Sequence, residues 1–233
     1  MSYDKIILRF CRCCESKNLF NLFGKNKDKH DSFNLCLNCF NVQREEFTTI
    51  PTVTNEHIDP EWLHRYLISK YNEGRLDLKL LEVRSDGSSR LEKFNDINIR
   101  SAAMDILSTP EESDQPVNFV LAENILDRSL NPKKTLDKLS DIVDQSSGII
   151  ILTVGTDVKK NISVFSAYSL SIIASRSGFG IVDIFKVKSD TEEIIVAFLK
   201  KFEAHSKSLD RLIQEEESDG RYNIGSYYEN NYN

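Results

Sequence analysis

The sequence predicts an α/β protein in which a small zinc-ribbon-like module precedes a mostly parallel sheet with helices on both faces. All five cysteines lie between positions 11 and 39. From about residue 76 onward, short apolar runs alternate with amphipathic segments, as they do when strands and helices alternate along the chain. The last two apolar runs follow each other closely, which is typical of an antiparallel hairpin.

Four of the cysteines form two C-x-x-C pairs, Cys11 with Cys14 and Cys36 with Cys39. Each pair lets two thiolates converge on one side of a tight turn, and two such pairs supply the tetrahedral sulfur shell that Zn²⁺ favours. Cys13 falls outside this spacing, so we expect it to be a spare thiol. Five buried cysteines without a metal are the alternative interpretation.

A zinc ion in this shell is expected to be structural. Four thiolates leave no open coordination position for a substrate, and residues 1–47 carry too few large apolar groups to fold without a metal. His30, in the lysine-rich loop between the pairs, is a substitute ligand to consider, although its neighbours suggest a solvated loop. DNA binding is the second use of such a module, but no helix rich in Arg and Lys follows Cys39.

The elements after this module follow from local patterns. Residues 48–75 are expected to form a linker and a helix, with Asp59 suited to the N-cap and Pro60 to the first turn. Residues 76–203 are expected to form the sheet domain, and residues 204–233 a helix to about Glu217 followed by a partly disordered tail. In the sheet domain, strands are expected at 78–83, 97–101, 117–122, 148–154, 180–187 and 192–199, and helices at 133–143 and 166–177, the latter with Tyr168, Ile172 and Ile173 inward.

The composition excludes several classes of function. The net charge of -6 provides no overall basic surface for nucleic acid or for an anionic membrane. No apolar run approaches the length of about 18 residues that a membrane span needs, and the N-terminal residues do not resemble a secretory signal. We therefore expect a soluble cytoplasmic protein that does not bind membranes.

Several segments together resemble the sugar C-methyltransferases, which use S-adenosylmethionine and act on deoxysugar nucleotides. The resemblance begins with the C-R-x-C motif at Cys11–Cys14 and the C-x-x-C-x-x-V-Q motif at Cys36–Gln43. It continues with E-V-R-S-D-G at Glu82–Gly87, VNFVLAENILDR at Val117–Arg128 and the F-S-x-x-S-L segment within Val164–Leu170. It covers about residue 10 to residue 200.

The resemblance implies a Rossmann-like class I methyltransferase sheet behind a zinc-binding domain. Its cofactor, S-adenosylmethionine, would bind at the turn after the first strand and at the end of a later strand. The residues of this sequence that match those places are Glu82, Ser85, Asp86, Gly87 and Glu123. If the chain is active, the resemblance implies a sugar nucleotide or another small molecule as the methyl acceptor.

The sequence also departs from the family at places that carry chemistry. Arg84 stands where a glycine allows the backbone to approach the cofactor, and one residue of that turn is missing. The expected second strand, 97–101, offers no carboxylate for the ribose hydroxyls, and we expect no counterpart of the family's C-terminal domain in these residues. The segment Asn161-Ile162-Ser163 replaces a His-Glu-His motif, and none of these three side chains can act as a general base near neutral pH.

Three hypotheses follow for the function. The first is a degenerate methyltransferase-like pseudoenzyme with a structural or partner-binding role, its partner being another protein or a second copy of the chain. The second is an active S-adenosylmethionine-dependent methyltransferase with an altered turn, in which the Arg84 side chain points outward into solvent instead of into the cofactor space. The third is a nucleic-acid-binding zinc-module protein, which the acidic composition does not favour.

Overall fold

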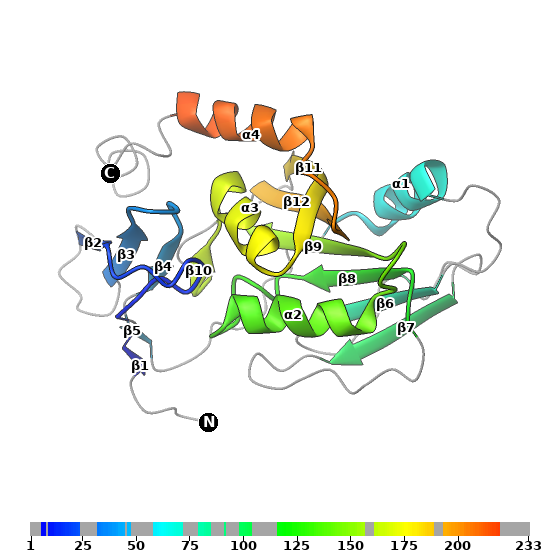
Figure 1. Cartoon of the computed structure of the whole chain (residues 1–233), viewed down its shortest axis with the longest axis horizontal. Coiled ribbons are helices and arrows are strands. Elements are labelled where there is room, and N and C mark those ends of the chain that lie inside the picture. The colour runs from blue at the N-terminus through cyan, green and yellow to red at the C-terminus, as the bar shows by residue number, and fades with distance from the viewer. Residues whose placement is uncertain are drawn as a thin grey trace.

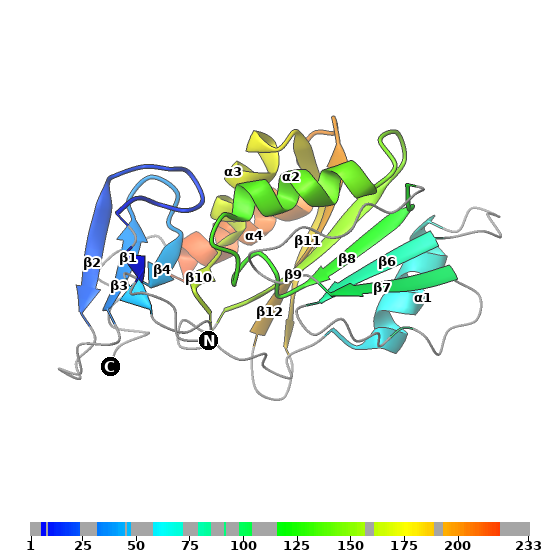
Figure 2. The ribbon, with the colours of Figure 1, turned by 90° about the horizontal axis from the view of Figure 1, so that it is seen from below.

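The computed structural model describes residues 6–7, 9–23, 32–44, 46–47, 58–71, 79–84, 91, 98–103, 116–156, 161–188 and 193–219 (Figure 1). Within these residues a small cysteine-bearing module stands beside one end of a larger α/β unit (Figures 1 and 2). None of the helices in the described residues is long and apolar enough to cross a membrane.

The large sheet has six strands in the order β11-β12-β9-β8-β6-β7. The strands β7, β6, β8 and β9 run parallel to their neighbours, whereas β12 is antiparallel to both β9 and β11. Figure 2 shows these strands fanning across the molecule. Their bounds are β6 Lys79–Arg84, β7 Asn98–Ala103, β8 Phe119–Glu123, β9 Ile149–Gly155, β11 Phe179–Lys188 and β12 Glu193–Lys201.

The central strands are buried on both faces, which explains why the sequence shows continuous apolar runs there. Every residue of β8 and β9 is buried. A parallel centre with an antiparallel strand inserted near one end is the arrangement of a Rossmann-like class I methyltransferase sheet, so the predicted fold class is confirmed. The predicted hairpin is also present, with β12 inside the sheet and β11 at its edge.

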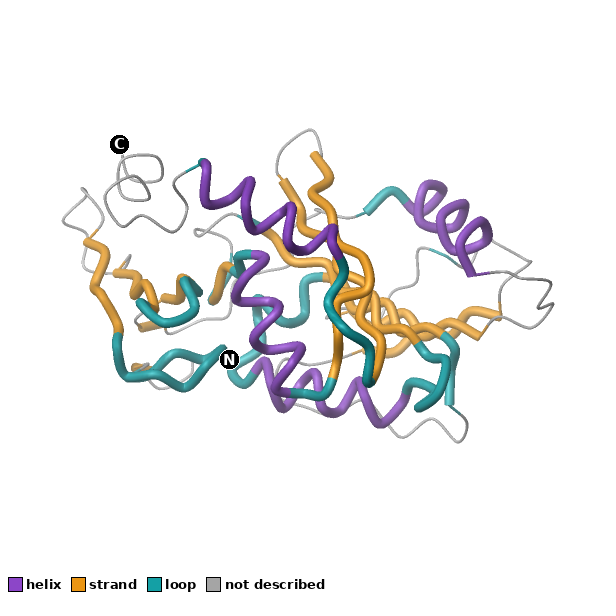
Figure 3. Tube along the Cα trace, turned by 45° about the horizontal axis from the view of Figure 1, so that its top comes forward, coloured by secondary structure: helices purple, strands orange, loops and turns teal. Residues whose placement is uncertain are grey.

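Helices cover both faces of this sheet (Figure 3). The helices α2 (Pro132–Ile142), α3 (Ala167–Arg176) and α4 (Lys207–Ser218) pack on one face, where they share a core with alternate residues of the strands. The helix α1 (Pro60–Tyr71) packs on the other face through Leu63 and Leu67. α4 confirms the helix expected to about Glu217, and its buried Glu216 accepts the Ala167 N–H at 2.8 Å.

The first turn of α1 follows the expected capping pattern. The Asp59 carboxylate accepts the Glu61 N–H at 3.0 Å, and Pro60 is the first helical residue. Trp62 and Tyr66 stack with ring centroids 5.2 Å apart, and Phe185 of β11 meets Trp62 edge-on at the same distance. These aromatic side chains fix α1 against the antiparallel end of the sheet.

The cysteine-bearing module is built on a second, smaller sheet with the order β10-β4-β3-β2. The strand β10 comes from a distant part of the chain, beyond β9, and pairs antiparallel with β4. Local hairpin patterns therefore account for only part of this sheet. The bounds of the strands are β1 Ile6–Ile7, β2 Leu19–Phe23, β3 Ser32–Cys36, β4 Val42–Arg44, β5 Glu46–Phe47 and β10 Ser163–Val164, with β1 and β5 forming a separate antiparallel pair.

The inward face of α3 differs from the prediction at one position. Ile173 is fully buried, as expected, but Tyr168 is 37% exposed. The buried stripe runs through Ala167, Leu170, Ile173 and Ala174, which are neighbours at helical spacing. Tyr168 lies at the margin of that stripe, where its ring lies 6.3 Å from the ring of Phe40 in the cysteine-bearing module.

Candidate metal centre and cofactor edge

The two C-x-x-C pairs adopt the same backbone turn. The residue after each second cysteine donates its N–H to the carbonyl of the first cysteine, Glu15 to Cys11 at 2.8 Å and Phe40 to Cys36 at 2.9 Å. These two residues have φ of 62° and 56°, in the left-handed region that favours glycine. A non-glycine residue there costs about 1–2 kcal/mol, so both turns must be held by further interactions.

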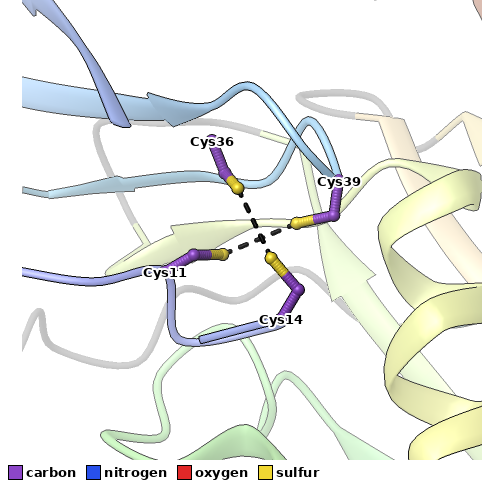
Figure 4. A group of neighbouring side chains, drawn as sticks. All are labelled: Cys11, Cys14, Cys36 and Cys39. Atoms are coloured by element: carbon purple, nitrogen blue, oxygen red, sulfur yellow. Dashed lines mark hydrogen bonds between the residues drawn. The ribbon is translucent and has the colours of Figure 1, made fainter. Parts of the chain in front are cut away.

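The four sulfur atoms that were predicted as ligands converge on one point between these turns (Figure 4). Sγ of Cys11 lies 3.5 Å from Sγ of Cys39, Sγ of Cys14 lies 3.5 Å from Sγ of Cys36, and all four atoms are within 4.8 Å of one another. Tetrahedral Zn²⁺ with bonds of about 2.3 Å separates its sulfur ligands by about 3.8 Å. The cysteines are free thiols, and the group fits a metal ion.

The electrostatics of the thiols are consistent with a cation at their centre. Hydrogen bonds from the Cys11 and Cys39 thiols lower the pKa of Cys36, and the same contact with Cys36 raises the pKa of Cys11. Closely packed thiols thus compete for protons, because one thiolate is stabilised only while its neighbours stay protonated. A divalent cation that replaces the shared protons lets all four sulfur atoms ionise.

Cys13 lies outside the ligand group and has a different partner. Its buried Sγ donates to the carbonyl of Ser169 in α3 at 3.1 Å. Cys13 therefore connects the first cysteine turn to the α/β unit. The sequence predicted only a spare thiol at this position. His30, the substitute ligand considered above, lies outside the described residues.

At the carboxyl end of the parallel strands, the structure brings together Glu82, Arg84 and Glu123. Pairing of Val83 with Ala122 places β6 and β8 side by side there. Nη1 of Arg84 lies 3.3 Å from Glu123 Oε2 and 3.9 Å from Glu82 Oε1, and the three side chains are at most 5% exposed. The Arg84 side chain therefore points inward and lies between two carboxylates. The prediction that it points outward into solvent is wrong.

The remaining predicted cofactor residues, Ser85, Asp86 and Gly87, lie outside the described residues. Glu82 does contact the segment that follows them, because its Oε2 accepts the Leu91 N–H at 3.4 Å. The second parallel strand, β7, ends at Ala103, two residues later than expected. Asp105, the next carboxylate in the sequence, lies outside the described residues.

The segment Asn161-Ile162-Ser163, which stands where the family has its histidine base, is buried. The N–H groups of Ile162 and Ser163 donate to the carbonyl of Asp127 at 3.1 and 2.9 Å. Ser163 is also the first residue of β10, opposite Gln43 of β4. This segment therefore joins the two parts of the molecule instead of exposing a proton acceptor.

Asp127 is a buried titratable group at this end of the sheet. It is fully buried, its Oδ2 accepts the Gly155 N–H at 3.2 Å, and its Oδ1 has no hydrogen-bond partner. Desolvation raises the pKa of this carboxyl group from 3.8 to about 6, against the opposing positive charge of Arg128. Asp127 thus titrates within an experimentally accessible range.

A pH-dependent stability follows from this pKa. The folded chain binds the proton more tightly than the unfolded chain, so the group stabilises the fold most at low pH, and this contribution is lost as the pH rises toward 6. Relative to wild type, the free energy of unfolding of Asp127→Asn should rise by about 2 kcal/mol between pH 4.5 and pH 7. Urea unfolding at the two pH values measures this difference.

The matched control for this prediction is Asp144→Asn. Hydrogen bonds from Ser147 and Ser146 lower the pKa of Asp144 to about 2, so that group stays ionised throughout the same pH range. The difference in free energy of unfolding between Asp144→Asn and wild type should therefore be constant between pH 4.5 and pH 7. An equally constant difference for Asp127→Asn would contradict the elevated pKa.

Comparisons with known proteins give only distant structural likenesses, to methyltransferases. No family model and no curated protein matches the sequence. The 1,6-didemethyltoxoflavin-N1-methyltransferase of Burkholderia thailandensis, solved with S-adenosylhomocysteine, is 10% identical over 77% of this chain and 99% of its own, with a TM-score of 0.44. Magnesium protoporphyrin IX methyltransferase from Synechocystis PCC 6803, solved with S-adenosylmethionine, is 11% identical over 61% of this chain and 77% of its own, with a TM-score of 0.43.

A third solved structure is the CurJ carbon methyltransferase, which is 11% identical with a TM-score of 0.43. The match covers 60% of this chain and 52% of that one, so the chain spans about half the length of this relative. The chain is methyltransferase-like in fold. That assignment rests on the order and directions of the strands, since these structural likenesses are distant.

Proposed function

We propose that this chain is a degenerate methyltransferase-like protein with a structural or partner-binding role, its N-terminal module held by a structural zinc ion. The observation that carries the proposal is the buried Arg84 side chain between Glu82 and Glu123. This arginine occupies the edge of the sheet at which the family resemblance places S-adenosylmethionine. The partner is another protein or a second copy of the chain.

The position of Arg84 opposes cofactor binding in two ways. Its guanidinium is positively charged, as is the sulfonium of S-adenosylmethionine, so the two repel each other at short range. Displacing Arg84 leaves two buried carboxylates without their cation, which costs about 3–5 kcal/mol. Because about 1.4 kcal/mol corresponds to a tenfold change, a micromolar affinity is weakened toward millimolar.

The buried segment at residues 161–163 supports the loss of proton-transfer chemistry. A general base must reach the proton that it removes, either directly or through one water. Asn161, Ile162 and Ser163 are each at most 2% exposed, and their backbone groups contact Asp127 and Arg44. Family resemblance alone does not carry activity from one protein to another, since activity depends on the residues of the site.

The cysteine group supports a structural role for its metal. Zn²⁺ with four thiolate ligands has no open position, so it neither activates water nor polarises a substrate. The two left-handed turns at Glu15 and Phe40 are unfavourable without an ion to hold them. Zinc binding therefore supplies folding free energy to a module with a small apolar core.

A second candidate function, an active methyltransferase acting on a sugar nucleotide or another small acceptor, is favoured by two observations. Glu82 keeps the place of the family's acidic residue at the end of the first strand and contacts Leu91 beyond the turn. Asp105 follows β7 closely enough in the sequence to be a ribose-binding carboxylate. Under this hypothesis, Arg84 moves when the cofactor binds.

Calorimetric titration of the zinc-loaded chain with S-adenosylmethionine and S-adenosylhomocysteine separates the two candidates. We expect no binding tighter than about 1 mM for either compound. Micromolar binding that is lost in Glu82→Ala would overturn the proposal and favour the active enzyme. Lys79→Ala, at the opposite end of the same strand, is the matched control and should behave like wild type.

A further inference from the structure

The side chain of Arg12 belongs by sequence to the first cysteine turn but lies against the α/β unit. Arg12 is only 5% exposed. Its Nε donates to the Leu130 carbonyl at 3.2 Å and its Nη1 to Ser163 Oγ at 3.1 Å, while its own N–H donates to Gln43 Oε1 at 2.9 Å. One residue between two cysteines thus contacts β4, β10 and the loop after β8.

Asp127 contacts the same segment from the other side. Its carbonyl accepts the N–H groups of Ile162 and Ser163. Burial lowers the pKa of the Arg12 guanidinium to about 9, and the charges of Cys11 and Asp127 oppose that shift. Arg12 Nη2 and Asp127 Oδ1 are buried atoms of opposite charge without a hydrogen-bond partner of their own. The start of β10 therefore accepts a hydrogen bond from a cation of the cysteine turn and donates to the backbone carbonyl of a residue in the α/β unit.

Arg176 of α3 forms a second connection to the same turn. Its Nη1 donates to the Cys13 carbonyl at 2.7 Å, and its Nη2 lies 2.8 Å from the Glu15 carboxylate. Cys13 donates in turn to the Ser169 carbonyl of α3. Every residue of the first turn that is not a predicted metal ligand, from Arg12 to Glu15, is thus tied to the α/β unit.

We infer that metal binding to the cysteine group stabilises the α/β unit through Arg12, which acts as a positioning residue for β10 and the loop after β8. This inference rests on the proposed zinc site. The ion fixes the backbone of the first turn, and the fixed turn holds the guanidinium where it donates to Leu130 and Ser163. Without the ion, the turn is no longer held, and Asp127 loses a nearby cation in a buried site.

The single tryptophan makes the inference measurable. Trp62 packs in the core on the α1 face of the large sheet, which contains none of the cysteines. Its fluorescence therefore reports unfolding of the α/β unit and not of the metal centre. In the zinc-loaded wild-type chain, we expect chelation with EDTA to lower the Trp62 unfolding midpoint by about 10 °C.

Arg12→Gln should uncouple the two parts. We expect it to retain about one zinc per chain, measured with a colorimetric chelator, while chelation shifts its Trp62 midpoint by less than half of the wild-type shift. Arg9→Gln, an exposed arginine of the same segment, is the control and should keep the full shift. If Arg12→Gln does not fold, Ser163→Ala, which removes only the Nη1 acceptor, should show a smaller reduction of the same kind.

The outcomes separate this inference from the zinc proposal. Absence of zinc from the wild-type chain overturns both. Zinc at one per chain with no chelation-induced shift at Trp62 overturns the coupling alone, as does a full shift in Arg12→Gln or, where that variant is unfolded, in Ser163→Ala. A reduced shift in the variant with unchanged zinc content supports Arg12 as the connection.

Discussion

Cys36→Ser should lose its metal and unfold the N-terminal module, roughly the first 45 residues. Cys36 Sγ lies 3.5 Å from Cys14 Sγ, and the turn that begins at Cys36 also carries Cys39, another member of the cysteine group. Zinc binding contributes on the order of 10 kcal/mol or more to small zinc-dependent modules, and hydroxyl is a poor replacement for thiolate. Zinc content by mass spectrometry should fall from about one per chain to near zero, with hydrogen exchange accelerated in β3 and β4.

Cys13→Ser is the matched control, because it changes the same atom in a cysteine outside the ligand group. A serine hydroxyl can still donate to the Ser169 carbonyl. We therefore expect this variant to keep its zinc and its protected module. Full zinc content in Cys36→Ser, or zinc loss in Cys13→Ser, would show that the ligand set is wrong.

The convergence of the four cysteines and the central strands could be predicted because their signals are local. A C-x-x-C pair fixes two sulfur positions within one turn, and two pairs suffice to propose the site. The strands β8 and β9 are buried on both faces, so each leaves a continuous apolar run in the sequence. The close spacing of the last two runs likewise predicted the hairpin of β11 and β12.

Features that depend on pairing between distant segments could not be predicted in the same way. β10 is only two residues long and pairs with a strand far away in the sequence. From the sequence alone, Asn161-Ile162-Ser163 therefore indicated only that the family's histidine base is missing, and not that this segment pairs with β4. The partners of Arg84 depend on the register between β6 and β8, which no sequence pattern reveals. The strand β7 ends at Ala103, two residues beyond the predicted end of the second strand.

Arg84→Met should strongly destabilise the protein at the carboxyl end of the parallel strands. The substitution keeps a long side chain but removes the cation that lies between Glu82 and Glu123, two carboxylates that are at most 3% exposed. Removing one partner of a buried ion pair costs about 3–5 kcal/mol, because it leaves uncompensated buried charge. Urea unfolding followed by Trp62 fluorescence measures the loss.

Two further variants identify the lost charge as the cause. Arg84→Lys keeps a cation but removes Nη1, the nitrogen that lies near both carboxylates, so its loss of stability should be smaller than that of Arg84→Met. Combining Arg84→Met with Glu82→Gln and Glu123→Gln removes all three charges and should recover most of the stability, since neutral replacement of a buried ionic triad is often close to energetically neutral. If Arg84→Met instead unfolds within about 1 kcal/mol of wild type, the carboxylates do not depend on Arg84, and displacement of this arginine by S-adenosylmethionine would meet little resistance.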